Sequence, residues 1–215
     1  MNRRTGVVAT IALSALAFGG GVLLYSGSVA GEPAPQVKAV PAANLVRPHS
    51  AIIGPKNAPV TIVEFFDPSC EACRAYFPQV KAILAANPKN VRLVMRYLPL
   101  HPGSAEAIVM LEAARAQGKL EPVMAAILEA QPDWHDGKMD GAWAAAEKAG
   151  LDVAKARAMS SDQPMAWMEQ DIADARALGV RGTPTFFVDG KPLDSFSPEQ
   201  LDAQVRAAVA AKKKK

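Results

Sequence analysis

VTIVEFFDPSCEAC, residues 60–73, carries the strongest structural signal in the chain. Its first seven residues are β-branched or aromatic apart from one glutamate, which predicts a short buried strand over residues 60–66. Asp-Pro-Ser ends that strand, and from the first cysteine to about residue 86 the apolar residues recur at helical spacing. Residues 91–97, VRLVMRY, predict a second strand, so a parallel strand–helix–strand crossover is expected.

Cys70 and Cys73 are the two cysteines of the chain, which excludes a disulfide-stapled scaffold. Two residues between cysteines on a first helical turn place the sulfurs within disulfide reach, and the helix N-terminus stabilises a thiolate there. We therefore expect Cys70 to be the attacking nucleophile and Cys73 the resolving thiol. A static disulfide or half of a metal site is the alternative. The three histidines, however, are scattered and supply no second ligand pair: His49, His101 and His135.

Glu64 lies six residues before the first cysteine, inside the predicted strand. A carboxylate is costly to bury unless it has a task, and a buried acid below a cysteine pair can relay protons during thiol–disulfide exchange, with a raised pKa. The alternative is an edge position from which Glu64 reaches solvent. Alternation along the strand does not decide its face, and we favour the buried acid.

Thr183 and Pro184 precede a third apolar run, and a proline there cannot donate a hydrogen bond to a sheet. If the Thr183–Pro184 bond is cis, the backbone of Thr183 turns outward and can pair with an extended substrate chain. Residues 183–188 predict a strand, Asp189-Gly190 predicts a hairpin turn, and residues 191–194 predict the partner strand. A last helix is expected to begin after an N-cap serine at residue 197, with proline at its first position.

Between the two halves of the predicted sheet, residues 103–178 read as helix almost throughout, with breaks and no strand. Four or five helices are expected there, as an insertion over about residues 100–178. The folded domain is predicted to span residues 49–211. It follows a proline-rich linker over residues 31–48 and precedes a lysine tail at residues 212–215.

The N-terminal residues 1–30 have the pattern of an export signal. Residues 7–25 carry no charge, and a small-x-small pattern ends at Ala30. A signal peptide cleaved there and an uncleaved membrane anchor are both consistent with this length. Either one places the domain in an oxidising compartment, most simply a bacterial periplasm.

The net charge of +3 carries little information, because six positive residues at the two ends of the chain account for it. The folded part is near neutral or mildly acidic and has no basic stripe interleaved with aromatic residues. Nucleic-acid binding is therefore not expected.

Taken together, these motifs resemble the thioredoxin superfamily, and the helical insertion and Glu64 resemble its DsbA-like branch, over about residues 50–210. Residues 60–73 resemble the family's strand and active site. GVRGTPTFFVDGK, residues 179–191, resembles its cis-proline segment. The stretch from Leu98 to His101 and QGKLEPVMAAILEAQPDW, residues 117–134, are similar to the start of the insertion in secreted members.

The resemblance implies an α/β thioredoxin fold with a helical insertion between the β-α-β and β-β-α halves. By the same resemblance, Cys70 is the nucleophile, Cys73 resolves, Glu64 is the buried acid, and Thr183 and Pro184 face the substrate. It implies no cofactor beyond the redox-active disulfide of the two cysteines, and no metal. The implied partners are protein substrates with cysteines and a membrane redox partner that resets the disulfide.

The chain also departs from the family pattern. Strongly oxidising members carry Pro-His between the cysteines, where this chain has Glu71-Ala72. We therefore expect a Cys70 pKa higher than theirs and a less oxidising disulfide. A threonine before the proline resembles the isomerase and reductase branches. Those branches usually oligomerise through an N-terminal region, and because no oligomerisation helix is evident here, a monomer is expected.

The leading hypothesis is an extracytoplasmic thiol–disulfide oxidoreductase that acts on protein cysteines through a mixed disulfide. Sequence leaves its direction open, since the potential and the partners decide between oxidase, reductase and isomerase. One alternative is a dedicated reductant for a metal- or haem-binding partner. Another, from a different class, is a metal-binding or delivery module that uses the CxxC pair as soft ligands.

Overall fold

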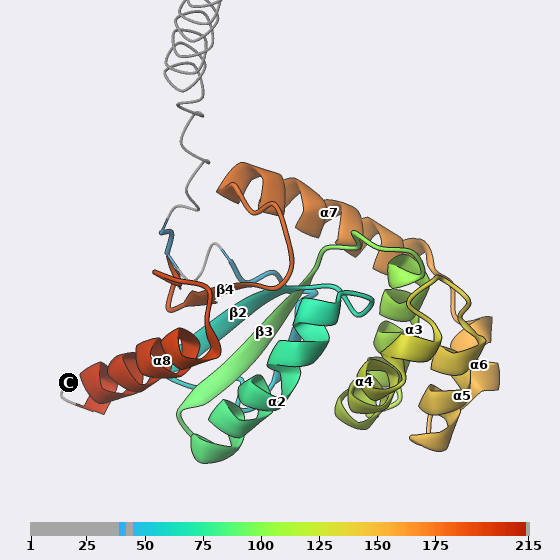
Figure 1. The fold of residues 1–215 in the computed structure, drawn as a ribbon, viewed down its shortest axis with the longest axis horizontal. Helices are drawn as coiled ribbons and strands as arrows, with labels where there is room; N and C mark the ends of the chain where they lie inside the picture. The colour runs from blue at the N-terminus through green and yellow to red at the C-terminus, as the bar shows by residue number, and fades with distance from the viewer. Residues whose placement is uncertain (1–38, 42–44, 214–215) are drawn as a thin grey trace, which may run out of the picture. The chain divides into compact units, whose positions relative to one another are not determined.

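The centre of the fold is a five-stranded mixed sheet, seen in a computed structural model that describes residues 39–41 and 45–213 (Figure 1). The strand order is β1-β3-β2-β4-β5. The strands are β1 (Ala51–Ile53), β2 (Val60–Phe66), β3 (Val91–Tyr97), β4 (Thr185–Val188) and β5 (Lys191–Pro192). β2 and β3 are parallel, and the other pairs are antiparallel. The near-continuous apolar sequence of β2 fits its central place, since both faces of the sheet are covered.

Helices cover the two faces of the sheet. On one face lie α2 (Glu71–Ala86) and α8 (Pro198–Lys213), which pack on side chains of β2 such as Ile62 and Phe66. On the other face lies α7 (Asp162–Leu178), which packs on Val63 and Phe65. Alternate residues of β2 therefore belong to two different cores, and the position of each residue along the strand determines which helices it meets.

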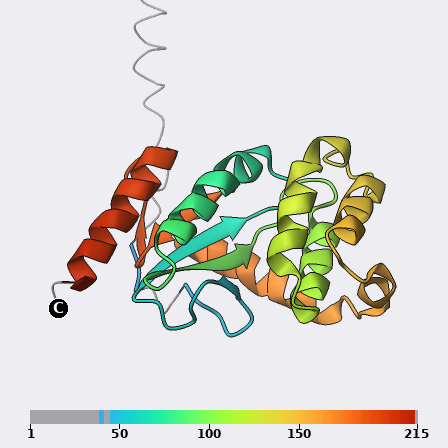
Figure 2. The ribbon, with the colours of Figure 1, turned by 90° about the horizontal axis from the view of Figure 1, so that it is seen from below.

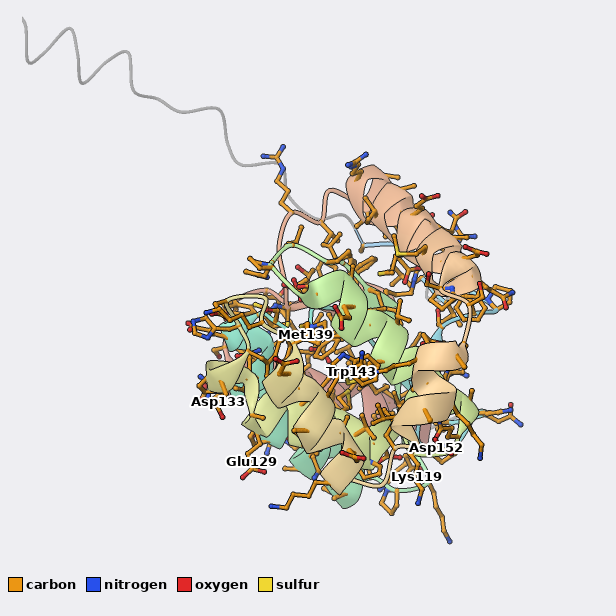
Figure 3. All side chains as sticks on the ribbon, turned by 90° about the vertical axis from the view of Figure 1, so that its right-hand side faces the viewer. Lys119, Glu129, Asp133, Met139, Trp143 and Asp152 are labelled. Carbon is orange, nitrogen blue, oxygen red and sulfur yellow. The ribbon has the colours of Figure 1, made fainter. Side chains whose placement is uncertain are left out.

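The remaining helices form the insertion, which lies at the opposite end of the sheet from α8 (Figures 1 and 2). They are α3 (Ser104–Ala116), α4 (Leu120–Glu129), the short 3-10 helix η2 (Gln131–Asp133), α5 (Asp140–Lys148) and α6 (Val153–Ala158). Trp143, labelled in Figure 3, joins three of them. From α5 its Nε1 donates to Oε1 of Glu106 on α3 at 2.6 Å, and the guanidinium of Arg157 on α6 lies 4.4 Å from its ring centroid.

The sequence-based expectations for the fold class are confirmed. Residues 60–66 and 91–97 are strands with the predicted bounds, and the stretch predicted as helical holds five α-helices, namely the four of the insertion and α7, which packs on the sheet. Asp189 and Gly190 form the hairpin turn with φ of 47° and 87°, the conformation that such turns require. Ser197 caps α8, because its Oγ accepts the backbone N–H of Gln200 at 3.1 Å.

The packed region begins earlier than the predicted start at His49. Leu45 is fully buried in the core beneath α7, and β1, which was not predicted, pairs antiparallel with β3. Further back, the N–H of Val40 donates to the carbonyl of Gly190 at 2.9 Å. A three-residue strand and a single buried leucine give no periodicity, so the sequence contained no signal for either.

Several predictions about the termini lie outside the described residues. These are the signal peptide or anchor at residues 1–30, most of the linker at residues 31–48, and the last two lysines. Within the part of the chain that the structure describes, no helix is both long and apolar enough to cross a membrane.

Candidate active site

The two cysteines lie at the N-terminus of α2, directly after β2. The turn between them and the strand is built by Asp67, whose carbonyl accepts the N–H of Cys70 at 3.1 Å and whose Oδ1 accepts the N–H of Ser69 at 2.9 Å. Cys70 is the N-cap of α2, and no side chain caps the helix. Both thiols are free and buried, with Cys70 exposed by 6% and Cys73 by 0%. The free N–H groups of the first turn therefore remain available to the Cys70 sulfur.

The surroundings of Cys70 favour its thiolate and lower its pKa to about 5. The largest cause is a hydrogen bond from the Cys73 thiol. Burial opposes the shift, and contacts with Thr183 and the backbone N–H groups of Cys73 and Ala72 add to it. The value lies between the ~7 of thioredoxin and the ~3.5 of DsbA. Cys70 is therefore a thiolate at neutral pH, and a good leaving group from a disulfide.

The pKa of the Cys73 thiol is shifted in the opposite direction, upward. Burial raises its pKa far above the usual range, and the hydrogen bond to Cys70 and the charge of Glu64 raise it further. Cys73 therefore holds its proton, and it needs a base before it can attack.

Glu64 lies in the middle of β2 and is 5% exposed. Ile62 and Phe66 are two positions before and after it in β2 and therefore point to the same face. Glu64 thus lies on the face of the sheet that contacts α2 and the cysteine pair. Burial, with a smaller contribution from the Cys70 charge, raises its pKa to about 8. The edge position considered as the alternative is wrong, because β2 is flanked by β3 and β4.

Thr183 lies directly against the redox pair. Its bond to Pro184 is cis, and its carbonyl oxygen is 3.2 Å from Sγ of Cys70, so it accepts a hydrogen bond from that thiol when the thiol carries its proton. Its Oγ1 is buried and has no hydrogen-bond partner among the described residues. Pro184 is buried and immediately precedes β4, which pairs with β2 opposite Glu64. The fold thus brings together residues that lie more than a hundred positions apart in the sequence.

Two residues at the site were not predicted. Asp67 was expected to end a strand and to add negative charge near the cysteines, yet it is fully buried and accepts hydrogen bonds from residues at the start of the insertion. Gln131 was placed in a helix break, yet it is 1% exposed and donates to the backbone of the turn before α2. A polar residue beside a proline in a helix break gives no sign of such a contact.

The histidines do not join the cysteines as a ligand set. His49 contacts Asp171, His101 contacts Asp67, and His135 is exposed and bonded to a local carbonyl. Within the described ranges, no three His, Cys, Asp or Glu side chains lie close enough together to hold a metal ion.

Residues 47–207 match a family model described as thioredoxin. The Na(+)/H(+) antiporter NhaA 1 of Salinispora arenicola is 35% identical over 162 residues, which are 73% of this chain and 24% of that protein. The chain thus spans about a quarter of the length of the curated relatives that it matches first.

Two solved structures are similar along most of their length. A thioredoxin-like oxidoreductase from Silicibacter pomeroyi DSS-3 is 31% identical with a TM-score of 0.69, covering 82% of this chain and 99% of its own. Wolbachia pipientis α-DsbA1 shares the fold at 16% identity with a TM-score of 0.65, covering 78% and 96% respectively.

Proposed function

The chain belongs to the thioredoxin family, and from this premise we propose that it is a thiol–disulfide oxidoreductase of the DsbA-like branch that acts on protein cysteines. One observation carries the proposal. A cysteine with a lowered pKa begins a helix, and a second cysteine that keeps its proton lies beside it. This asymmetry suits a nucleophile and a resolving thiol.

In the oxidising direction, a substrate thiolate attacks Sγ of Cys70. The Cys70–Cys73 bond breaks, and its electron pair leaves on Cys73, which takes up a proton. A second substrate thiolate then attacks the substrate sulfur of the mixed disulfide, and Cys70 leaves as a thiolate. The substrate loses two electrons and the pair gains them. In the reducing direction the same steps run in reverse.

Glu64 supplies or accepts the proton of Cys73 in these steps. Its raised pKa keeps it protonated near neutral pH, so Glu64 can give a proton to the Cys73 sulfur when Cys73 leaves. The Glu64 carboxylate that remains can later take that proton back. Thr183 and Pro184 face the substrate chain, and support for this comes from the contact between the Thr183 carbonyl and Cys70.

The proposed location is outside the cytoplasm. The charge-free residues 7–25 support it, either as a signal that is removed or as an anchor in the inner membrane. A membrane redox partner would reset the pair after each turnover, and the protein would act as a monomer.

The test is the equilibrium potential of the pair against glutathione, followed by trapping in cells with Cys73→Ala. We expect Cys73→Ala to accumulate mixed disulfides with protein partners, because the resolving thiol is gone. The matched control, Cys70→Ser combined with Cys73→Ala, should accumulate none. A strongly oxidising potential with many partners identifies an oxidase, and a reducing potential with one metalloprotein partner identifies a dedicated reductant. Stoichiometric zinc or copper binding with no mixed disulfide would refute the proposal in favour of a metal-binding module.

A further inference from the structure

The helical insertion holds the turn that carries Cys70, through polar contacts that the proposed mechanism does not use. Six hydrogen bonds join residues 67–70 to the insertion. Four of them involve Asp67 and Ser69. Asp67 accepts from the N–H of Leu100 at 2.8 Å, from Nδ1 of His101 at 2.7 Å and from Oγ of Ser104, and Oγ of Ser69 donates to the carbonyl of Pro102 at 2.9 Å.

Gln131, the first residue of η2, makes the other two. Its Nε2 donates to the carbonyl oxygens of Pro68 at 2.8 Å and of Cys70 at 3.0 Å. Both hydrogens of the amide are used, and the reverse orientation of the amide would set Oε1 against the same two carbonyls. Gln131 therefore fixes the direction of a carbonyl on each side of Ser69.

The direction of these carbonyls matters to the sulfur because no side chain caps α2. The carbonyl of Cys70 accepts the first hydrogen bond of the helix, from the N–H of Arg74 at 3.1 Å, while the N–H groups of Ala72 and Cys73 face the Cys70 sulfur. A change in the direction of the Cys70 carbonyl turns a rigid peptide plane, and with it the turn that presents those N–H groups.

We infer that Gln131 is a positioning residue for the redox pair. From the insertion it fixes the carbonyls of Pro68 and Cys70, and so holds the first turn of α2 with its N–H groups aimed at the Cys70 sulfur. The inference rests on the proposed function, and it gives the helical insertion a part in the chemistry.

The amide of Gln131 is poorly suited to a purely structural role. Its Oε1 is buried and has no hydrogen-bond partner among the described residues, and an unsatisfied buried acceptor offsets what the two donated bonds contribute. An apolar side chain of similar length removes the unsatisfied oxygen together with the donors. Gln131→Met also leaves the Pro68 carbonyl without this donor, which costs some stability, so the change that the inference predicts is one in the surroundings of Cys70.

The test compares reduced Gln131→Met with reduced Gln117→Met in the otherwise intact chain. Gln117 is the matched control, because its amide also bridges backbone groups within the insertion. Its Nε2 and Oε1 contact Asp152 at 3.1 and 2.9 Å, on the face of the insertion seen in Figure 3. The readouts are the pKa of Cys70, from the pH dependence of alkylation and of thiolate absorbance, and the potential of the pair.

For Gln131→Met we expect the pKa of Cys70 to rise by about one unit, and the disulfide to become less oxidising because its leaving thiolate is less stable. Gln117→Met should keep both wild-type values. A Gln131→Met protein with the wild-type pKa and potential would overturn the inference, whether or not its melting temperature falls.

A second variant protects the test against misfolding. Gln131→Asn keeps a neutral amide but is one methylene shorter, which draws the donors away from the two carbonyls, so it should shift the Cys70 pKa in the same direction. Failure of the proposed function is distinguishable, because it would be seen in the wild-type chain as an ordinary Cys70 pKa and no thiol exchange.

Discussion

At the scale of single residues, Glu64 shows how burial changes the protonation of an ordinary carboxylate. It is 5% exposed in an apolar strand, and its pKa is raised to about 8, first by burial and then by the Cys70 charge. Between the ordinary value of 4.5 and about 8, the folded protein keeps a proton that the unfolded chain releases. The stabilisation from this proton is therefore fully present below pH 4.5 and is lost as the pH rises through about 8.

Glu64→Gln should abolish that pH dependence. In the reduced protein, the free energy of unfolding of the variant should rise relative to wild type by up to about 1.4 kcal/mol per pH unit across this window. Thiol exchange should be slower at the Cys73 step. Denaturant unfolding at several pH values checks the first expectation, and stopped-flow resolution of a mixed disulfide checks the second.

The control is Glu71→Gln, the same chemical change at the exposed residue next to Cys70. Its stability should run parallel to that of wild type with pH. A flat difference between wild type and Glu64→Gln would contradict the assignment of Glu64 as a buried, protonated acid.

The sequence alone pointed to those site residues whose chemistry follows from residue type and spacing. The CxxC pair and the proline before β4 are of this kind, and so is the acid in β2, although the strand pattern left its face undecided. Asp67 and Gln131 could not be found in this way. Their partners lie more than thirty positions away, in the insertion for Asp67 and in the turn before α2 for Gln131, and no local pattern reports such contacts.

At the scale of elements, long and strongly patterned segments were predictable and short ones were not. β2, β3 and α8 have apolar runs or a cap that determine their bounds. β1 has three residues, too few for alternation, and it exists because the edge of β3 is available for pairing. The segment before it, predicted as linker, packs because Leu45 fills a site between the sheet and α7.

Leu45→Ala should therefore destabilise the fold although it lies in a segment without secondary structure. Leu45 is 0% exposed, and removing a buried leucine side chain costs about 2–5 kcal/mol. Urea unfolding measures the change. Leu100→Ala is the control, since that leucine is 51% exposed and should cost well under ~1 kcal/mol. Equal losses for the two variants would mean that residues 45–50 do not belong to the folded unit.

At the scale of the whole described domain, one buried charge network joins the sheet, α7 and the N-terminal segment. Arg96 on β3 is fully buried, and its guanidinium donates to Asp171 and to the Leu45 carbonyl, both at 2.7 Å, and to Asp174. Asp171 also accepts the N–H of Tyr97 at 2.7 Å. The sequence VRLVMRY predicted a strand, but a strand pattern does not reveal where a buried arginine finds its partners.

The same network binds the segment before β1. Arg47 donates to both carboxylate oxygens of Asp174 at 2.7 Å, and His49 lies 2.8 Å from Asp171. Although burial opposes it, the two arginines lower the pKa of Asp174 to about 2. This carboxylate therefore stabilises the fold above its ordinary pKa of 3.8, and that contribution is lost as the pH falls through about 2.

Arg96→Met should be among the most destabilising single changes in the domain. It leaves the fully buried carboxylate of Asp171 with His49 and the Tyr97 N–H as its partners, and breaking a buried ion pair from one side costs about 3–5 kcal/mol. Adding Asp171→Asn to Arg96→Met should recover part of that loss, because the amide oxygen still accepts from Tyr97 and the stranded charge is gone. The double variant should thus be more stable than Arg96→Met alone, as measured by urea unfolding of all four proteins of the cycle.

Arg206→Met is the control, since the Arg206–Asp202 pair is solvent-exposed and should contribute under ~1 kcal/mol. If the second substitution adds its own loss to the first, the penalty of Arg96→Met does not come from the buried charge. The network would then act through the packing of the arginine side chain rather than through its ion pairs.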